Sequence, residues 1–181
     1  MIVVDAHQDL AWNMLTFGRD YTLAAAETRD RERGSIAVRE NGDTLLGWPD
    51  YQRGRVAIIF STLFAAPLHT KKGEWDTQAY ADADEAESLY RAQLDAYHRL
   101  VDENPNKFRL LRTLADLEEH LSAWQEETAT PPVGLVVLME GAEGVRSPAA
   151  LEEWWQRGVR IIGPAWAGTR FCGGMYLRRQ T

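Results

Sequence analysis

Two residues near the start of the chain, His7 and Asp9, could together bind a metal ion. They directly follow residues 2–4, a short β-branched run that is typical of a strand. Side chains at positions i and i+2 of a strand point to the same side, so an imidazole nitrogen and a carboxylate oxygen can reach one point. This donor pair suits zinc or a similar divalent cation. A His-x-Asp spacing alone is frequent by chance, so its context decides the interpretation.

A third candidate ligand, Glu140, follows the apolar run 135–139. A carboxylate at the end of a buried strand is costly unless it is paired or bound to a metal. Active sites of β/α folds collect at the C-terminal ends of strands, where all three residues are expected to lie. The other interpretation of Glu140 is a solvated loop or helix-start carboxylate ahead of Gly141. The shared position of the three residues favours a metal site.

The elements expected around these residues alternate between strand and helix. The strand candidates are nearly continuous apolar runs, typical of parallel strands covered on both faces. They lie at residues 2–4, 57–64, 108–111, 133–139 and 159–162. Helices are expected over residues 77–104, from Thr113 onward, and from Ser147 to just before Gly158. The alternation predicts a parallel sheet with right-handed crossovers in one domain, residues 1–181. Residues 34–54 are expected to form an irregular loop.

Composition narrows the classes of partner and the compartment. The formal net charge of −7 argues against a nucleic-acid surface, which needs a basic footprint. One cysteine, Cys172, excludes an internal disulfide. No apolar run approaches the roughly 20 residues of a membrane span, and the N-terminus does not resemble a signal peptide. We therefore expect a cytoplasmic protein without nucleic-acid or membrane partners.

Three segments, in order along the chain, resemble the membrane (renal) dipeptidase family of zinc metallopeptidases. Residues 4–10 (Val-Asp-Ala-His-Gln-Asp-Leu) are similar to its opening Asp-x-His-x-Asp-Leu motif. Residues 138–142 are similar to its Glu-Gly segment, and residues 151–162 to its helix-then-strand element. The resemblance implies an α/β fold of the (β/α)8 TIM-barrel-type metallo-dependent hydrolases. About 250 residues build such a barrel, so this chain would supply about its first half.

The resemblance also implies a chemistry, the cleavage of dipeptides or related small amides at two zinc ions. His7 and Asp9 would ligate the first ion, and Glu140 would bridge both. Two cations would lower the pKa of a water between them and polarise the peptide carbonyl.

The chain departs from the family's pattern at the residues that would complete the second metal site. The family takes two further histidines and an aspartate from later strands, but no histidine follows Glu140 here. His98 and His120 fall in expected helices, as packing or surface residues. His69, in the loop after the second long strand, is a substrate-side candidate. We therefore expect at most one zinc ion and negligible hydrolysis of dipeptides.

A second departure follows the last strand. Trp166 stands where renal-type members carry a substrate-facing histidine, so Trp166 and Arg170 are substrate-side candidates. They could equally be a packing residue and a surface charge. The same departure argues against ordinary dipeptide specificity.

Two rival functions are considered. The first is a non-catalytic α/β module that assembles through its open sheet edges. The second is a nucleotide-binding domain, which is disfavoured because residues 7–13 contain no glycine for a phosphate loop. For the hydrolase itself, we expect as partner either a second copy, in a homo-oligomer, or a missing C-terminal half of the barrel.

Overall fold

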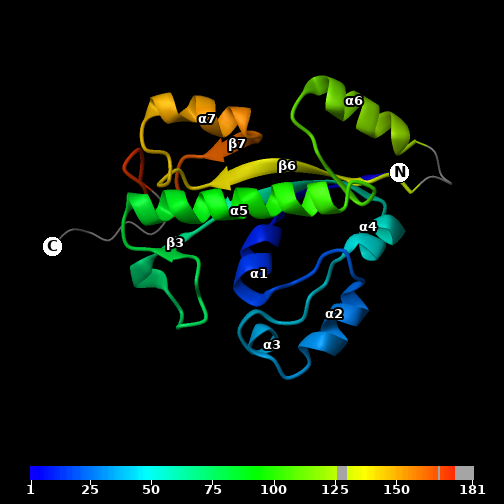
Figure 1. The fold of residues 1–181 in the computed structure, drawn as a ribbon, viewed down its shortest axis with the longest axis horizontal. Helices are drawn as coiled ribbons and strands as arrows, with labels where there is room; N and C mark the ends of the chain where they lie inside the picture. Colours follow the sequence, from blue (N-terminus) through cyan, green and yellow to red (C-terminus); the bar gives the residue numbers. More distant parts are fainter. Residues whose placement is uncertain (126–129, 167, 174–181) are drawn as a thin grey trace.

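The fold is built on a parallel sheet flanked by helices (Figure 1). The computed structural model describes residues 1–125, 130–166 and 168–173. Strand β2 lies between β1 and β6, while β5 and β7 pair with the first and last residues of β6. The five strands are β1 (Val3–Gln8), β2 (Val56–Phe64), β5 (Phe108–Leu110), β6 (Val133–Glu140) and β7 (Val159–Gly163). All their pairings are parallel, as the alternation predicts.

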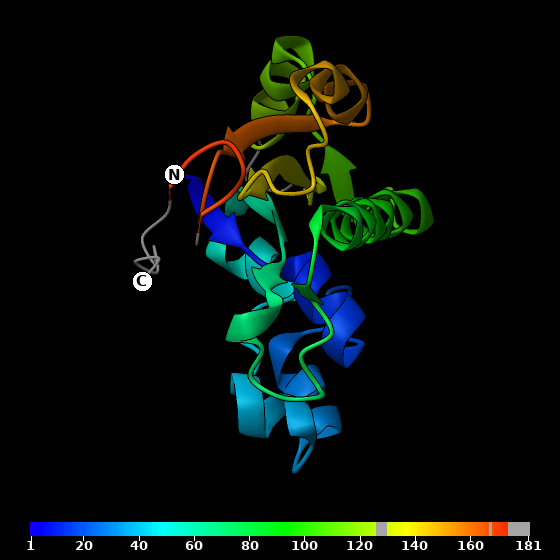
Figure 2. The same ribbon diagram turned by 90° about the vertical axis from the view of Figure 1, so that its left-hand side faces the viewer.

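Helices connect the strands, and the longest of them, α5, runs alongside β6 (Figure 1). Figure 2 shows α5 and the N-terminus on opposite sides of the sheet. A small second sheet, β3 (Ala66–Pro67) and β4 (Ala79–Tyr80), follows β2. The helices are α1 (Leu10–Phe17), α2 (Ala25–Glu32), α3 (Ile36–Asn41), α4 (Trp48–Gly54), α5 (Ala83–Glu103), α6 (Leu114–Ala123) and α7 (Leu151–Gln156). Two short 3-10 helices are Leu68–Thr70 and Pro148–Ala150.

Local sequence signals set several helix ends. The Asp82 side chain accepts bonds from two backbone amides of the first turn of α5. Thr113 and Asp116 form a reciprocal capping box at the start of α6, where a helix was expected to begin. Pro148 lies in a 3-10 turn ahead of α7, so the third expected helix begins with a tighter turn than an α-helix.

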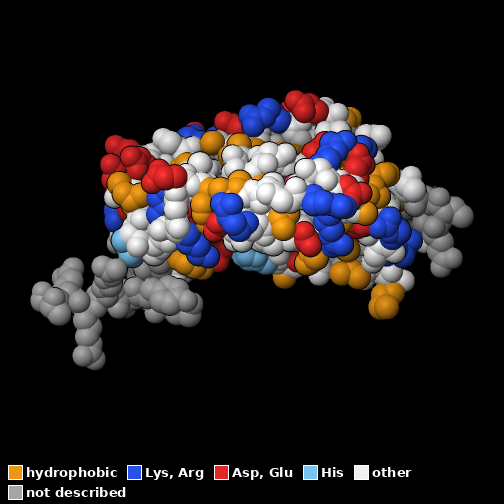
Figure 3. Space-filling view, turned by 90° about the horizontal axis from the view of Figure 1, so that it is seen from below, with side chains coloured by type: hydrophobic (Ala, Val, Ile, Leu, Met, Phe, Trp, Pro, Cys, Tyr) orange, Lys and Arg blue, Asp and Glu red, His pale blue; other side chains and the backbone are white. Residues whose placement is uncertain are grey.

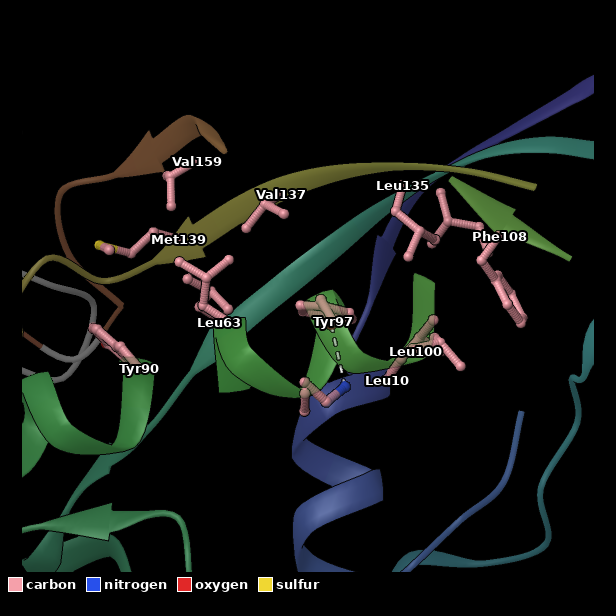
Figure 4. Close-up of a cluster of buried hydrophobic side chains, with 14 of the residues drawn as sticks. Leu10, Leu63, Tyr90, Tyr97, Leu100, Phe108, Leu135, Val137, Met139 and Val159 are labelled. Atoms are coloured by element: carbon pink, nitrogen blue, oxygen red, sulfur yellow. Dashed lines mark hydrogen bonds between the residues drawn. The ribbon is translucent and has the colours of Figure 1, made fainter. Parts of the chain in front are cut away.

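The core lies between the sheet and α5 (Figure 4). Leu135, Val137 and Met139 of β6 are fully buried on this side, together with Leu63 of β2. The intervening residues of β6, Val136 and Leu138, are only half-buried. The expectation that the strands are covered on both faces is therefore met only in part by β6, whose second face is half-buried among the described residues.

Two other expectations are corrected. Residues 34–54 contain α3 and α4 rather than an irregular loop, because Ser35 caps α3 and a proline opens α4. The helix expected from residue 77 starts at Ala83, because Tyr80 pairs with Pro67 across the small sheet. A helical stripe counted from sequence cannot see that pairing, which joins residues distant along the chain.

The surface carries both signs of charge. On the face shown in Figure 3, Lys and Arg side chains lie among Asp and Glu side chains, with hydrophobic side chains between them. Among the described residues, no helix has both the length and the apolar character required to cross a membrane. The single-domain boundary 1–181 and the cytoplasmic location stay predictions.

Candidate metal centre

The structure brings His7, Asp9 and Glu140 together. One potential ligand atom from each residue lies within 4.8 Å of the corresponding atoms of the other two. The closest contact joins His7 Nε2 to Glu140 Oε2 at 2.8 Å. The His7 side chain is 49% exposed and that of Glu140 26%, so the cluster faces solvent at the sheet end. Within the described part of the chain, this is the one group of three or more His, Cys, Asp or Glu residues whose ligand atoms lie close enough to share a metal ion.

An irregularity in β1 helps to aim His7. The strand pairs Asp5 with Ile59 and Gln8 with Ser61, so β1 carries one more residue than β2 between these pairs. Such a bulge changes the direction of side chains and is common next to active sites. Asp9 then lies outside the strand, at the N-cap of α1, and makes no side-chain cap bond to the helix. The simple i, i+2 alternation therefore predicted that these side chains converge, but not the backbone that positions Asp9.

Buried polar residues hold the end of β1. The Asp5 carboxylate accepts bonds from His7 N at 3.1 Å and from Gln8 Nε2 at 2.7 Å. The Tyr51 hydroxyl in turn donates to Gln8 Oε1 at 2.6 Å. Burial raises the pKa of Tyr51 well above its usual value, so this hydroxyl stays protonated and remains a donor.

Thr62, near the C-terminal end of β2, holds Asp9. Its hydroxyl is buried and contacts both the Asp9 carboxylate and the Gln8 carbonyl. A donor that orients a carboxylate ligand is typical of the outer shell of metal sites. Sequence reasoning missed Thr62 and Tyr51, because a single threonine in an apolar strand and a tyrosine in an expected loop carry no signal of their partners.

Glu140 ends β6 and is followed by a turn that requires glycine. Glu140 pairs with Phe64 on one side and with Gly163 on the other. Gly141 has a φ of 84°, in the left-handed region that side chains with a Cβ rarely adopt. The Glu-Gly pair therefore combines a candidate ligand with the turn that ends its strand.

The electrostatics of the cluster favour a cation. Burial lowers the pKa of His7, but the hydrogen bond with Glu140 and the negative charges of Asp9, Glu140 and Asp5 raise it more. The net effect is a raised pKa, so the same negative field that would attract a metal ion attracts a proton. One imidazole nitrogen and two carboxylates form a donor set that zinc accepts, with room for a water as fourth ligand.

The other histidines lie outside the cluster. His69 is exposed in the 3-10 helix Leu68–Thr70. His98 Nε2 bonds to the Arg157 carbonyl at 2.9 Å, and His120 is fully buried with Nε2 2.8 Å from the Ala57 carbonyl. His98 and His120 therefore make structural bonds, as expected for helix positions, and a substrate-side role for His69 stays a prediction.

The two substrate-side candidates that follow β7, Trp166 and Arg170, have different surroundings. The half-buried ring of Trp166 packs edge-to-face against Phe64, with ring centroids 5.1 Å apart. Because Phe64 is the strand partner of Glu140, Trp166 lies beside the cluster. The Arg170 guanidinium bonds to the carbonyls of Glu143 and Val145, each at 2.9 Å. These bonds tie Arg170 to the loop after β6, and its substrate-side role stays a prediction.

The fold is similar to that of solved metallopeptidases. No curated protein matches the chain. Similar solved structures include a dipeptidase described as a metallopeptidase of family M19, at 22% identity and a TM-score of 0.60. A metallopeptidase from Rhodobacter sphaeroides, liganded with a phosphinate mimic of the dipeptide L-Ala-D-Ala, has 19% identity and a TM-score of 0.65. The probable dipeptidase PvdM from Pseudomonas aeruginosa has 20% identity and a TM-score of 0.55.

The coverage is unequal. The matches include 92%, 92% and 80% of this chain but only 43%, 46% and 37% of the three structures, in the same order. The chain thus spans less than half the length of these relatives. The predicted fold class is confirmed, with this chain corresponding to part of the barrel. A family model described as membrane dipeptidase, peptidase family M19, matches residues 1–180. The chain therefore belongs to the membrane dipeptidase family of metallopeptidases.

Proposed function

We propose that His7, Asp9 and Glu140 bind zinc, and that the chain is the metal-binding part of a dipeptidase-like hydrolase. Its substrates would be dipeptides or related small amides. The observation that carries the proposal is the convergence of the three side chains, from the ends of two separate strands, in a member of the M19 family. Their positions at the C-terminal end of a parallel sheet are those at which β/α barrels place catalysis.

Each residue has a distinct task at such a centre. A bound zinc ion supplies a Lewis acid that lowers the pKa of water and polarises a carbonyl. His7 must lose its proton to offer Nε2, and Glu140 is positioned to hold the imidazole at 2.8 Å until it does. Asp9 adds a negative charge and is oriented by Thr62. The substrate-side candidates Trp166, Arg170 and His69 are proposed only to contact the substrate.

We expect one zinc ion rather than two in this 181-residue polypeptide. The described residues hold three clustered ligands, and the other histidines of the chain, His69, His98 and His120, all precede Glu140. Activation of a water between two metals needs donors for the second ion. The polypeptide by itself is therefore expected to hydrolyse dipeptides negligibly.

Self-association is the second part of the proposal. Val3 and Val4 of β1 are 44% and 51% exposed, and β1 pairs only with β2 among the described strands. An apolar strand with a free edge is a template for pairing with another chain. Either a second copy or a chain that supplies the rest of the barrel would cover it. The same feature supports the rival function, a non-catalytic module assembled through its sheet edges.

Zinc content separates the two functions. Purified chain is saturated with zinc, dialysed, and measured for metal per chain and for mass in solution. We expect about one zinc ion per chain in the wild type. The His7→Ala and Glu140→Gln variants should lose it, while His69→Ala, which alters an exposed histidine outside the cluster, should retain it. Hydrolysis is assayed on a panel of L,L- and L,D-dipeptides.

Equal zinc content in the wild type and the His7→Ala variant would refute the metal site and leave the assembly module. Robust dipeptide turnover that His7→Ala abolishes would confirm the metal site but contradict the single-zinc expectation. A monodisperse, protease-resistant monomer at micromolar concentration would contradict the proposed self-association.

A further inference from the structure

A polar stripe on α5 lies beneath the candidate metal centre. Tyr90, Gln93 and Tyr97 are three and four residues apart, so they share one face of the helix. They are 1%, 0% and 0% exposed, within a largely apolar core. Burying a hydroxyl or amide is unfavourable unless it is hydrogen-bonded, so the partners of these groups reveal what they stabilise.

All three side chains bond to backbone near the ligands. The Tyr90 hydroxyl donates to the carbonyl of Glu140 itself, at 3.2 Å. The Tyr97 hydroxyl donates to the Thr62 carbonyl at 2.8 Å and accepts from Ala11 N at 3.2 Å, the latter drawn as a dashed line in Figure 4. Tyr97 therefore connects β2, which carries Thr62, to α1, which begins after Asp9.

Gln93 bonds to the backbone of Phe64, the last residue of β2. Its Oε1 accepts from Phe64 N at 2.8 Å, and its Nε2 donates to the Phe64 carbonyl at 2.5 Å. Strand β1 ends opposite Ser61, so the last residues of β2 extend past that pairing. One amide side chain thus completes both backbone groups of Phe64, as a neighbouring strand would. Gln93 Nε2 also donates to Gln78 Oε1 at 2.8 Å.

The tyrosine hydroxyls are held in the donor state. Burial raises the pKa of Tyr90 and of Tyr97 far above the usual tyrosine value. Each therefore remains protonated and can donate to a carbonyl. The stripe thus reaches the backbone of Glu140, of Thr62 and Phe64, and of the first turn of α1, which are the three segments that carry or orient the ligands.

We propose that Tyr90, Gln93 and Tyr97 are positioning residues that hold the metal-binding side chains at their mutual distances. The proposal rests on the proposed metal site, and it assigns to α5 a task beyond packing. Metal ligands must be held within a few tenths of an ångström of the geometry that binds the ion. Substitution of the residues that support them commonly lowers metal affinity about 10–100-fold.

The test uses Tyr90→Phe, which removes one hydroxyl and keeps the ring. Tyr80→Phe is the matched control, because Tyr80 is also buried but lies in the small sheet. Two quantities are measured in the intact chain, the zinc dissociation constant by titration and backbone amide exchange without metal. We expect Tyr90→Phe to weaken zinc binding about tenfold. Exchange at Gly141 and Ala142, whose amides bond to the Gly163 and Pro164 carbonyls, should accelerate about tenfold.

The outcomes separate this proposal from the metal site. Faster amide exchange that is confined to residues beside Glu140 in Tyr90→Phe, and is absent from Tyr80→Phe, supports the positioning role. This holds even if the wild type binds no zinc. The absence of zinc binding would overturn only the proposed function. Unchanged exchange at Gly141 and Ala142 overturns the positioning role. A uniform acceleration over the whole sheet also overturns it, because this is the result of a purely structural contact. If Tyr90→Phe does not fold, Tyr97→Phe is measured at Ala11 with the same criteria.

Discussion

Replacing Thr62 by valine isolates the bond that holds Asp9. Valine has nearly the shape of threonine, so the substitution removes the hydroxyl without opening a cavity at this fully buried position. The Asp9 carboxylate and the Gln8 carbonyl both lose the contact. A hydrogen bond to a charged group contributes about 1.5–3 kcal/mol, so we expect the free energy of unfolding to fall by about 2 kcal/mol. For a chain of this size, that corresponds to a melting temperature lower by about 6 °C.

Thr16→Val is the matched control. The Thr16 hydroxyl is buried without a hydrogen-bond partner among the described residues, so its loss should change stability by less than about 0.5 kcal/mol or increase it. Thermal and urea unfolding of both variants are compared with the wild type, and zinc titration should show affinity reduced about tenfold only for Thr62→Val. Equal stability and equal zinc affinity of the two variants would refute the assignment of Thr62 as the residue that orients Asp9.

The remaining predictions concern pH, the core and a buried ion pair. Zinc binding should weaken as pH falls through the raised pKa of His7, because a proton and zinc compete for Nε2. Without metal, protonated His7 should stabilise the fold fully below its pKa in the unfolded chain, which is about 6.5. This stabilisation should be lost as pH rises through the higher pKa of the folded chain, so the melting temperature measured from pH 5 to 8 should fall. Leu63→Ala should cost about 2–5 kcal/mol in urea unfolding, whereas Leu114→Ala, at a position 69% exposed, should cost less than about 0.5 kcal/mol. Arg19→Met should cost about 3–5 kcal/mol, because it leaves Glu32, its partner at 3.0 Å, without a counter-charge in a nearly buried site; a loss below about 1 kcal/mol would contradict this.

Local patterns predicted the parts of the fold that depend on neighbouring residues. The apolar runs of β2, β6 and β7 and the cap of α6 follow from short stretches of sequence, and the structure contains them. The helices α1 to α4 were not predicted, because each is only about two turns long and, in α2 to α4, charged residues interrupt the apolar positions. Short helices owe their stability to tertiary packing more than to their own sequence.

The candidate ligands were found from sequence because chemistry and position coincide in them. His7, Asp9 and Glu140 are polar residues at the ends of apolar runs, and the family match over residues 1–180 agrees with the segments that contain them. Their binding of zinc stays a prediction. The residues that support them carried no such signal, since Thr62, Tyr90 and Gln93 sit among apolar neighbours at ordinary strand and helix positions.

The sequence by itself therefore determined the parallel α/β class, the family and the three residues that could bind a metal, since each follows from residue type and order along the chain. The tertiary structure alone decided that His7 Nε2 lies 2.8 Å from the carboxylate of Glu140, 133 residues away. It also decided that α5 bonds to the backbone of Glu140 in β6 and of Thr62 in β2. The physical reason is that strand register, the bulge in β1 and the rotation of α5 are set by packing between distant segments. A hydrogen bond depends on tenths of an ångström in that packing, which no local pattern specifies.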